Sequence, residues 1–167
     1  MTPITVRRGL IDDADGINGV YNPFIRDTAV TFETVELSLD DRRRWFEARE
    51  DDLRYPVVVA ETGKGEICGF ASASPFDQRA GYATSVKTSV FVDPVCHGKG
   101  AGAALYTALF KALENSGVHR AYGLIAAPNP SSAALHKRFG FRHVATLDEV
   151  GRKFGRFINV MWFEKAL

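Results

Sequence analysis

A glycine-rich turn in the middle of the chain is the segment best suited by residue type to bind a ligand. It reads His97-Gly98-Lys99-Gly100-Ala101-Gly102, follows a break at Asp93-Pro94, and leads into an Ala/Leu-rich stretch. Glycines leave backbone N–H groups uncovered, and at the start of a helix these groups are unpaired and lie at the positive end of the helix dipole. The sequence therefore predicts an anion site at this turn, suited above all to phosphate.

Two common phosphate-binding motifs fit this turn poorly. Gly98, Gly100 and Ala103 match the G-x-G-x-x-A pattern of dinucleotide folds, but the turn lies mid-chain, and the acid at about the expected distance, Glu114, falls inside the predicted helix. A Walker A loop requires Gly-Lys-Ser/Thr, whereas Lys99 is followed here by Gly100. Another class of phosphate-bearing ligand is therefore favoured.

The elements that position the turn follow from hydrophobic periodicity and from breaker residues. Strands are predicted at 4–7, 56–61, 67–74, 84–92, 121–126, 141–150 and 157–164. Helices are predicted at 13–21, from Ser38 to before Tyr55-Pro56, from the glycine turn to near Ser116-Gly117, and from Asn129 through Phe139. Asn22-Pro23 is expected to break the chain, 28–34 to form an ordered loop or short strand, and 151–155 to form a basic loop. This order predicts a mixed α/β (α+β) protein, with antiparallel hairpins first.

Length and composition limit the class of protein. The chain has 167 residues, 46% hydrophobic and 25% charged, with a formal net charge of +1, which predicts a single globular domain over residues 1–167. The net charge gives no basis for nucleic acid or an anionic membrane as partner, and no transmembrane or secretory segment is seen. Cys68 and Cys96 form neither a disulfide framework nor a metal-ligand spacing, which fits a reducing cytoplasm and no metal.

The glycine turn and its surroundings resemble the GNAT acetyltransferase superfamily. The acyl-CoA pyrophosphate loop of that superfamily reads Gln/Arg-x-x-Gly-x-Gly/Ala after a strand, and His97 stands here in place of the usual Gln or Arg. The resemblance covers almost the whole chain and is greatest for the branch with phosphinothricin and methionine-sulfone/sulfoximine acetyltransferases. The matching segments are Tyr21-Asn22, 31–34, Trp45-Phe46, 55–57, Ala71-Ser72, 89–92, Asn129, Ser132, Leu135-His136, 139–141 and 150–155.

The resemblance implies a GNAT fold: a mixed, mostly antiparallel, twisted sheet with helices on both faces, split at the central strand to admit acetyl-CoA as acetyl donor. The pantetheine arm is then expected along Val90-Phe91-Val92, and Asn129 either hydrogen-bonds the cofactor or simply opens the following helix. The residues expected to bind the pyrophosphate are His97, Gly98, Lys99, Gly100, Ala101, Gly102 and Ala103.

Two residues are catalytic candidates for the reaction that the resemblance implies, direct attack of a neutral amine on the thioester. Because a histidine ordinarily titrates near neutral pH, His136 could protonate the thiolate or relay the amine proton, although alone it also fits a half-buried helix histidine with no role. Lys87 stands where the branch typically has a glutamate proposed as general base. Lys87 could bind the acceptor's carboxylate. Another group, such as Glu33, His136 or a water chain, could act as the base, or the protein could be a weak or inactive paralogue. Lys87 could also simply be a solvated strand lysine.

The acceptor is expected near an early loop and the segment before the central strand, which the resemblance relates to substrate binding. The candidate residues are Phe32, Glu33, Thr34, Phe76, Arg79, Tyr82 and Lys153. Arg79 or Lys153 could pair with a carboxylate, or each could be a surface cation. Residues 156–159 read Arg-Phe-Ile-Asn instead of the branch's usual Arg-Trp-Leu-Asp, which leaves the substrate open.

The resemblance implies acetyl-CoA-dependent N-acetylation of the α-amino group of a small amino acid or analogue, of the phosphinothricin or methionine-sulfone/sulfoximine type. Two alternatives remain open: acetylation of a protein or peptide amine, and a non-catalytic acyl-CoA-binding protein, which the lysine at position 87 motivates. The resemblance also implies a homodimer.

Overall fold

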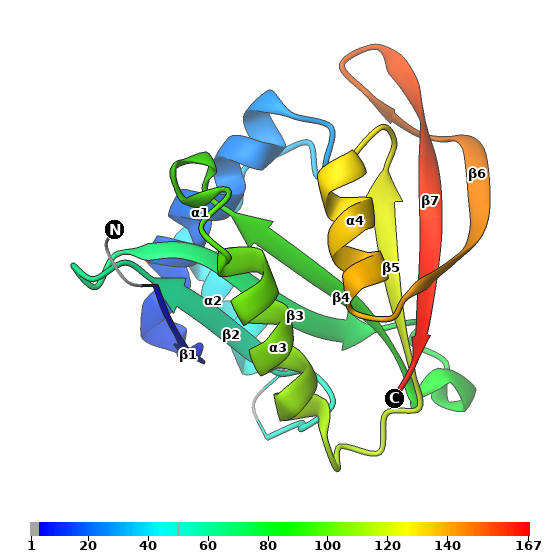
Figure 1. The fold of residues 1–167 in the computed structure, drawn as a ribbon. Coiled ribbons are helices and arrows are strands. Elements are labelled where there is room, and N and C mark those ends of the chain that lie inside the picture. Colours follow the sequence, from blue (N-terminus) through cyan, green and yellow to red (C-terminus); the bar gives the residue numbers. More distant parts are fainter. Residues whose placement is uncertain (1–3, 50) are drawn as a thin grey trace.

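Seven strands form one sheet with helices on both faces in the computed structural model, which describes residues 4–49 and 51–167 (Figure 1). The strands are β1 (Thr5–Arg8), β2 (Val57–Glu61), β3 (Ile67–Pro75), β4 (Ser85–Val92), β5 (Arg120–Ala126), β6 (Arg142–Lys153) and β7 (Arg156–Ala166). The helices are α1 (Ala14–Asp27), α2 (Leu39–Glu47), α3 (Ala101–Leu113) and α4 (Pro130–Arg138). No helix within the described residues is long and apolar enough to cross a membrane.

The strand order is β1-β2-β3-β4-β5-β7-β6, which places β4 at the centre of the sheet. All neighbouring strands pair antiparallel except β4 and β5, which pair parallel. The predicted mixed, mostly antiparallel sheet is therefore confirmed. β6 and β7 form a long hairpin at one edge (Figure 1).

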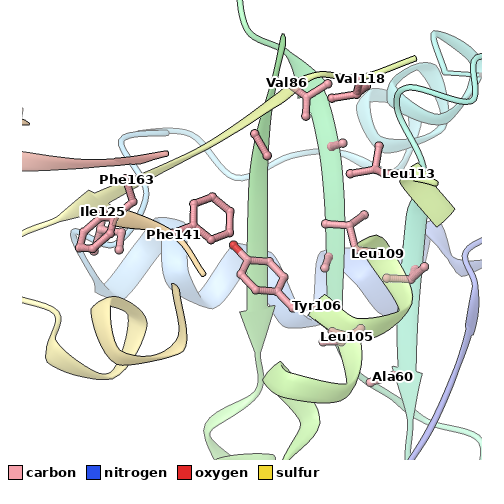
Figure 2. Packing of buried hydrophobic residues seen from close by; sticks show 14 of the residues in the cluster. Ala60, Val86, Leu105, Tyr106, Leu109, Leu113, Val118, Ile125, Phe141 and Phe163 are labelled. Atoms are coloured by element: carbon pink, nitrogen blue, oxygen red, sulfur yellow. The ribbon is translucent and has the colours of Figure 1, made fainter. Parts of the chain in front are cut away.

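Each face of the sheet has its own apolar core. On one face, Leu105 and Leu109 of α3 pack over the sheet with Phe141 and Phe163 (Figure 2). On the other face, Ile17 and other apolar residues of α1 pack on β2 and β3. Because side chains alternate between faces along a strand, the two clusters together bury both sides of β3 and β4.

The first helix differs from the prediction, because α1 continues through Asn22-Pro23 to Asp27. A proline inside a helix loses one hydrogen bond and costs about 3 kcal/mol. The burial of Ile17, Val20 and Ile25, each at most 4% exposed, offsets that cost. The Asn22 side chain hydrogen-bonds the Leu37 backbone at 3.0 and 3.1 Å and so anchors the segment after α1.

Two further element predictions meet different outcomes. Ser38 is confirmed as the N-cap of α2, since its hydroxyl accepts a hydrogen bond from the Asp41 N–H at 3.1 Å. The basic loop predicted at 151–155 is wrong in extent, because Gly151 to Lys153 pair with Ile158 to Arg156 and belong to β6. Cross-strand pairing across a short turn at Phe154-Gly155 overrides the local glycine and charge signal.

Candidate active site

The central strand forks away from its neighbour, as predicted. β4 pairs with β3 from Val86 to Val92, but it pairs with β5 only from Ser85 to Lys87. From Thr88 onward, the side of β4 that faces β5 has no ladder partner, and Figure 1 shows the two strands diverging. Backbone N–H and C=O groups on that side need other partners, so this edge, which includes Val90-Phe91-Val92, fits the amides of an extended pantetheine arm.

The glycine turn at the wide end of the fork has the geometry of an anion site. Gly98 and Gly100 have φ angles of +73° and +82°, which favour glycine, and a Cβ at either position would meet nothing within 4 Å. The first intrahelical bond of α3 runs from the Ala104 N–H to the Gly100 carbonyl, so the N–H groups before it remain unpaired. Unpaired N–H groups at the start of a helix are the donors that a pyrophosphate would need.

Three other predicted donor-binding residues are placed as follows. The exposed His97 donates from Nε2 to the Val92 carbonyl at 2.8 Å, so its ring ties the turn to β4. Asn129 is the N-cap of α4, with Oδ1 accepting from the Ser132 N–H at 3.1 Å. Ala101, Gly102 and Ala103 form the first turn of α3, and Lys99 precedes its N-cap residue, Gly100.

His136 lies inside the core beneath β5 and is 4% exposed. Its Nδ1 donates to the Ser132 carbonyl at 2.8 Å, which leaves Nε2 to accept from the Tyr106 hydroxyl at 2.9 Å. Burial lowers the pKa of His136, so the ring is neutral near pH 7. The ring rests against the backbone of Gly123, where a Cβ would come within 2.2 Å of Nε2.

A chain of hydroxyl groups leads from His136 toward the fork. Tyr106 is fully buried in α3, and its oxygen lies 3.5 Å from the Thr88 hydroxyl. Thr88 is the first β4 residue beyond the paired region, and its hydroxyl lies 3.4 Å from the Tyr122 carbonyl on β5. His136 therefore connects to the fork through two buried side chains.

Lys87 lies at the vertex of the fork, opposite Ser74 on β3 and Tyr122 on β5. Its neighbours Val86 and Thr88 are buried toward α3, so alternation points Lys87 to the other face of the sheet. It is half-buried, and its ammonium forms no ion pair within the described residues. The charge of Lys87 contributes to the lowered pKa of Asp77, but the Asp77 carboxylate is hydrogen-bonded to Arg79 at 2.8 Å, so the Lys87 ammonium can still pair with a ligand.

A pocket of about 460 Å³ lies on that same face, next to the segment between α1 and α2. It is called the Phe32 pocket here, and its lining residues are Val30, Phe32, Leu124, Ala126, Leu147, Val150, Gly151, Arg152, Val160 and Trp162. Apart from one arginine the lining is uncharged and mostly apolar. Leu124 alternates with Gly123 and Ile125 on β5, which are buried on the opposite side, so the pocket and the His136 core lie on opposite faces of the sheet.

Of the predicted acceptor residues, one lines the Phe32 pocket and the others lie outside it. Phe32 lines it directly, whereas Phe76 packs on Trp162 and Tyr82 with ring centroids 5.9 and 5.4 Å apart and does not line it. Arg79 is exposed and paired with Asp77 at 2.8 Å. The Asp77 pKa is lowered, first by the hydrogen bond from Arg79, so Arg79 already has an anion partner.

The remaining acceptor candidates lie on the other side of Phe32. Thr34 and Lys153 line a second pocket of about 470 Å³, called the Lys153 pocket, with Ile25, Arg26, Glu36, Arg152, Phe154 and Gly155. Glu33 is exposed and lines neither pocket. Lys153 is 5% exposed and donates to the Thr31 carbonyl at 2.8 Å, so it is a buried residue instead of a surface cation.

Sequence reasoning missed several residues of the site. Tyr106 and Gly123 contact His136, Thr88 contacts Tyr106, and Leu124 and Trp162 line the Phe32 pocket. The sequence contained one signal for Tyr106: a tyrosine in the apolar stripe of a helix requires a hydrogen-bond partner for its hydroxyl.

Comparison with known proteins places the chain in a family. A sequence model described as acetyltransferase (GNAT) domain matches residues 11–162. A phosphinothricin N-acetyltransferase of Streptomyces coelicolor is 45% identical over 165 residues, which is 98% of this chain and 96% of that protein. An L-methionine sulfoximine/L-methionine sulfone acetyltransferase of Pseudomonas paraeruginosa is 31% identical over 163 residues, which is 98% of this chain and 94% of that protein.

Solved structures agree with the fold and with the ligand that the fork fits. The crystal structure of a GNAT superfamily phosphinothricin acetyltransferase from Sinorhizobium meliloti, in complex with acetyl-CoA, superposes with a TM-score of 0.93 at 29% identity. The match covers 100% of this chain and 89% of that one. The chain therefore belongs to the GNAT acetyltransferase family and is an N-acetyltransferase that uses acetyl-CoA.

Proposed function

We propose that the chain acetylates the α-amino group of a small amino acid or amino-acid analogue, of the phosphinothricin or methionine-sulfone type. The Phe32 pocket carries this proposal. Its volume of about 460 Å³ and mostly apolar lining suit a small molecule, whereas a polypeptide acceptor would favour a polar groove. The names of the relatives similar to this chain support the same substrate class.

The two faces of the sheet divide the work of the reaction. Acetyl-CoA supplies the acetyl thioester when bound along the fork and the glycine turn. The acceptor reaches the same point from the Phe32 pocket on the other face, so donor and acceptor meet where β4 and β5 separate. The new N–C bond replaces the C–S bond, the amine loses a proton and the sulfur gains one. His136, connected to the fork through Tyr106 and Thr88, is the proposed proton carrier.

Lys87 is proposed to bind the acceptor's carboxylate at the vertex of the fork. Lys87 is half-buried and forms no ion pair with any described residue, although Asp77 is near enough to interact with its charge. The acceptor's carboxylate would supply a direct partner. Lys87→Met should raise KM for an amino acid but not for its methyl ester, which lacks the anion. Equal effects on both acceptors would contradict this role.

The proposed function is tested by thiol release from acetyl-CoA with a panel of acceptors. The panel contains phosphinothricin, methionine sulfone, methionine sulfoximine, common amino acids and short peptides. Saturable turnover with amino acids or analogues, and none with peptides, is the expected result. Preference for peptides would contradict the proposal, and stabilisation by acetyl-CoA without turnover of any amine would favour a non-catalytic acyl-CoA-binding protein.

We also propose that the chain forms a homodimer through the β6–β7 edge. Exposed apolar side chains gather there, with Val150, Phe154 and Phe157 being 60%, 54% and 61% exposed. Apolar patches of this kind mark protein interaction sites, and β6 is an edge strand. Light scattering should give twice the mass of the chain, and Phe157→Asp should shift it toward a monomer. A monomeric wild type would contradict the proposal.

A cytoplasmic location is proposed on chemical grounds. Acetyl-CoA is the donor, and Cys68 and Cys96 are buried free thiols, as expected in a reducing compartment. Cell fractionation with a tagged chain tests this, and recovery outside the cytoplasm would contradict it.

A further inference from the structure

Lys153 is a buried cation that the reaction described above does not use. Its side chain comes from the end of β6 and is 5% exposed, and Nζ donates to the Thr31 carbonyl at 2.8 Å across 122 residues of sequence. A buried ammonium is costly unless its partners stabilise the charge. Burial lowers the pKa of Lys153, and the charge of Glu33 raises it. A lysine held in this way fixes the two segments it joins.

The segment on the other end of this hydrogen bond has no helix or strand of its own. It is called the acceptor segment here and comprises residues 28–37, between α1 and α2. Thr31 is 9% exposed, and its hydroxyl also pairs with the Tyr21 hydroxyl at 2.7 Å. The acceptor segment is therefore held at Thr31 from two sides, by β6 and by α1.

Phe32, which follows Thr31 in the acceptor segment, lines the Phe32 pocket. The Phe32 ring packs so closely on Gly151 that a Cβ there would lie 2.2 Å from two ring carbons. The Phe32 pocket and the Lys153 pocket flank the acceptor segment, and Arg152 lines both. A displaced acceptor segment would therefore change the shape of the Phe32 pocket.

We propose that Lys153 is a positioning residue that fixes Phe32 and thereby sets acceptor affinity and selectivity. The proposal rests on the proposed function, because it takes the Phe32 pocket as the acceptor site. Lys153 acts through Thr31 and need not touch the acceptor. It thus has a different role from the direct carboxylate partner that its charge alone suggests.

Lys153→Met tests the proposal, because methionine keeps an unbranched apolar side chain and removes the ammonium. KM for the acceptor should rise about tenfold or more, the loss expected for a hydrogen bond to a charged group. KM for acetyl-CoA should change little, since the glycine turn and fork lie on other elements. The thermal midpoint should fall by no more than a few degrees, the effect of one lost hydrogen bond in a chain of this size. Discrimination between acceptors of different side-chain size should fall. The matched control is Lys64→Met, which removes an exposed lysine in the β2–β3 turn and should leave all parameters unchanged.

A second variant displaces Phe32 without altering Lys153. Gly151→Ala places its Cβ against the Phe32 ring, and Gly151 has no left-handed φ that would strain alanine. It should reproduce the selective rise in acceptor KM, and the double variant should be less than additive because both act through one side chain. Gly19→Ala is the control, because its Cβ would meet nothing within 4 Å.

Hydrogen exchange separates this proposal from the proposed function. Lys153→Met should speed amide exchange in residues 28–37 and leave α3 unchanged. If the wild type turns over no acceptor, the proposed function fails. Independently of that result, unchanged exchange in residues 28–37 of the Lys153→Met variant would overturn the role of Lys153. With an active wild type, the role is also overturned by an unchanged acceptor KM, or by both KM values and the thermal midpoint shifting together as in general destabilisation.

Discussion

Gly123→Ala is the substitution whose effect the structure determines most sharply. A Cβ at position 123 would lie 2.2 Å from Nε2 and 2.4 Å from Cδ2 of His136, far inside contact distance. The ring has little room to withdraw, because it is 4% exposed and lies 4.9 Å from Phe141 and 5.3 Å from Tyr106 between ring centroids. The variant must therefore move His136 and break its bond to the Tyr106 hydroxyl.

Two costs add in this variant. Overpacking a core costs about 1–3 kcal/mol, and a buried hydroxyl left without its partner costs about 1–3 kcal/mol. At the lower end of both ranges the free energy of unfolding falls by about 2 kcal/mol. For a protein of this size that corresponds to a thermal midpoint roughly 4–8 °C lower.

Thermal unfolding by circular dichroism measures this effect, with Gly19→Ala as the matched control. Gly19 is exposed inside α1, so alanine should stabilise the helix by about 0.5–1 kcal/mol. The same change should thus have opposite signs at the two sites. A Gly123→Ala midpoint equal to or above that of the wild type would refute the placement of His136. In a His136→Ala background, which removes the ring, Gly123→Ala should cost much less.

Two further predictions concern proton binding and the donor site. Burial lowers the pKa of His136 below its ordinary value of 6.5, so the unfolded chain binds that proton first and the stability present above pH 6.5 is lost as pH falls. His136→Gln should therefore flatten the dependence of the thermal midpoint on pH below that value. Gly100→Ala forces a left-handed φ of +82° on alanine, a strain of about 1–2 kcal/mol. Calorimetry should therefore show roughly tenfold weaker binding of acetyl-CoA. An unchanged affinity would contradict the assignment of the glycine turn as the pyrophosphate site.

Local sequence patterns predicted the central strand and the glycine turn, whereas the fork was predicted only from the resemblance to the GNAT superfamily. The β-branched run ending at Val92 indicated the strand and the break at Asp93-Pro94 indicated the turn, because strand propensity and turn chemistry act over a few residues. Pro23 misled for the opposite reason. Tertiary burial of the apolar face of α1 outweighs the local cost of a proline, and no local pattern reports that burial.

The partners of single side chains could not be read from the sequence. Tyr106 and His136 lie 30 residues apart, and Lys153 and Thr31 lie 122 apart, so only the assembled sheet brings each pair together. The sequence predicts that Lys153 is a carboxylate-binding or surface cation, because its charge can be read from the sequence and its burial cannot. Register along β6 places it against Thr31.

The product of the reaction tests the central claim most directly. Incubation with acetyl-CoA carrying a labelled acetyl group and with methionine sulfone, followed by mass spectrometry, should show one labelled acetyl group on the α-nitrogen of the acceptor. The Gly100→Ala variant should form less of this product at low acetyl-CoA concentration and the same product at saturating acetyl-CoA. No product should form when the protein is omitted. An acetyl group on no offered amino acid or analogue, with no stabilisation of the chain by acetyl-CoA, would contradict the account from the glycine turn upward.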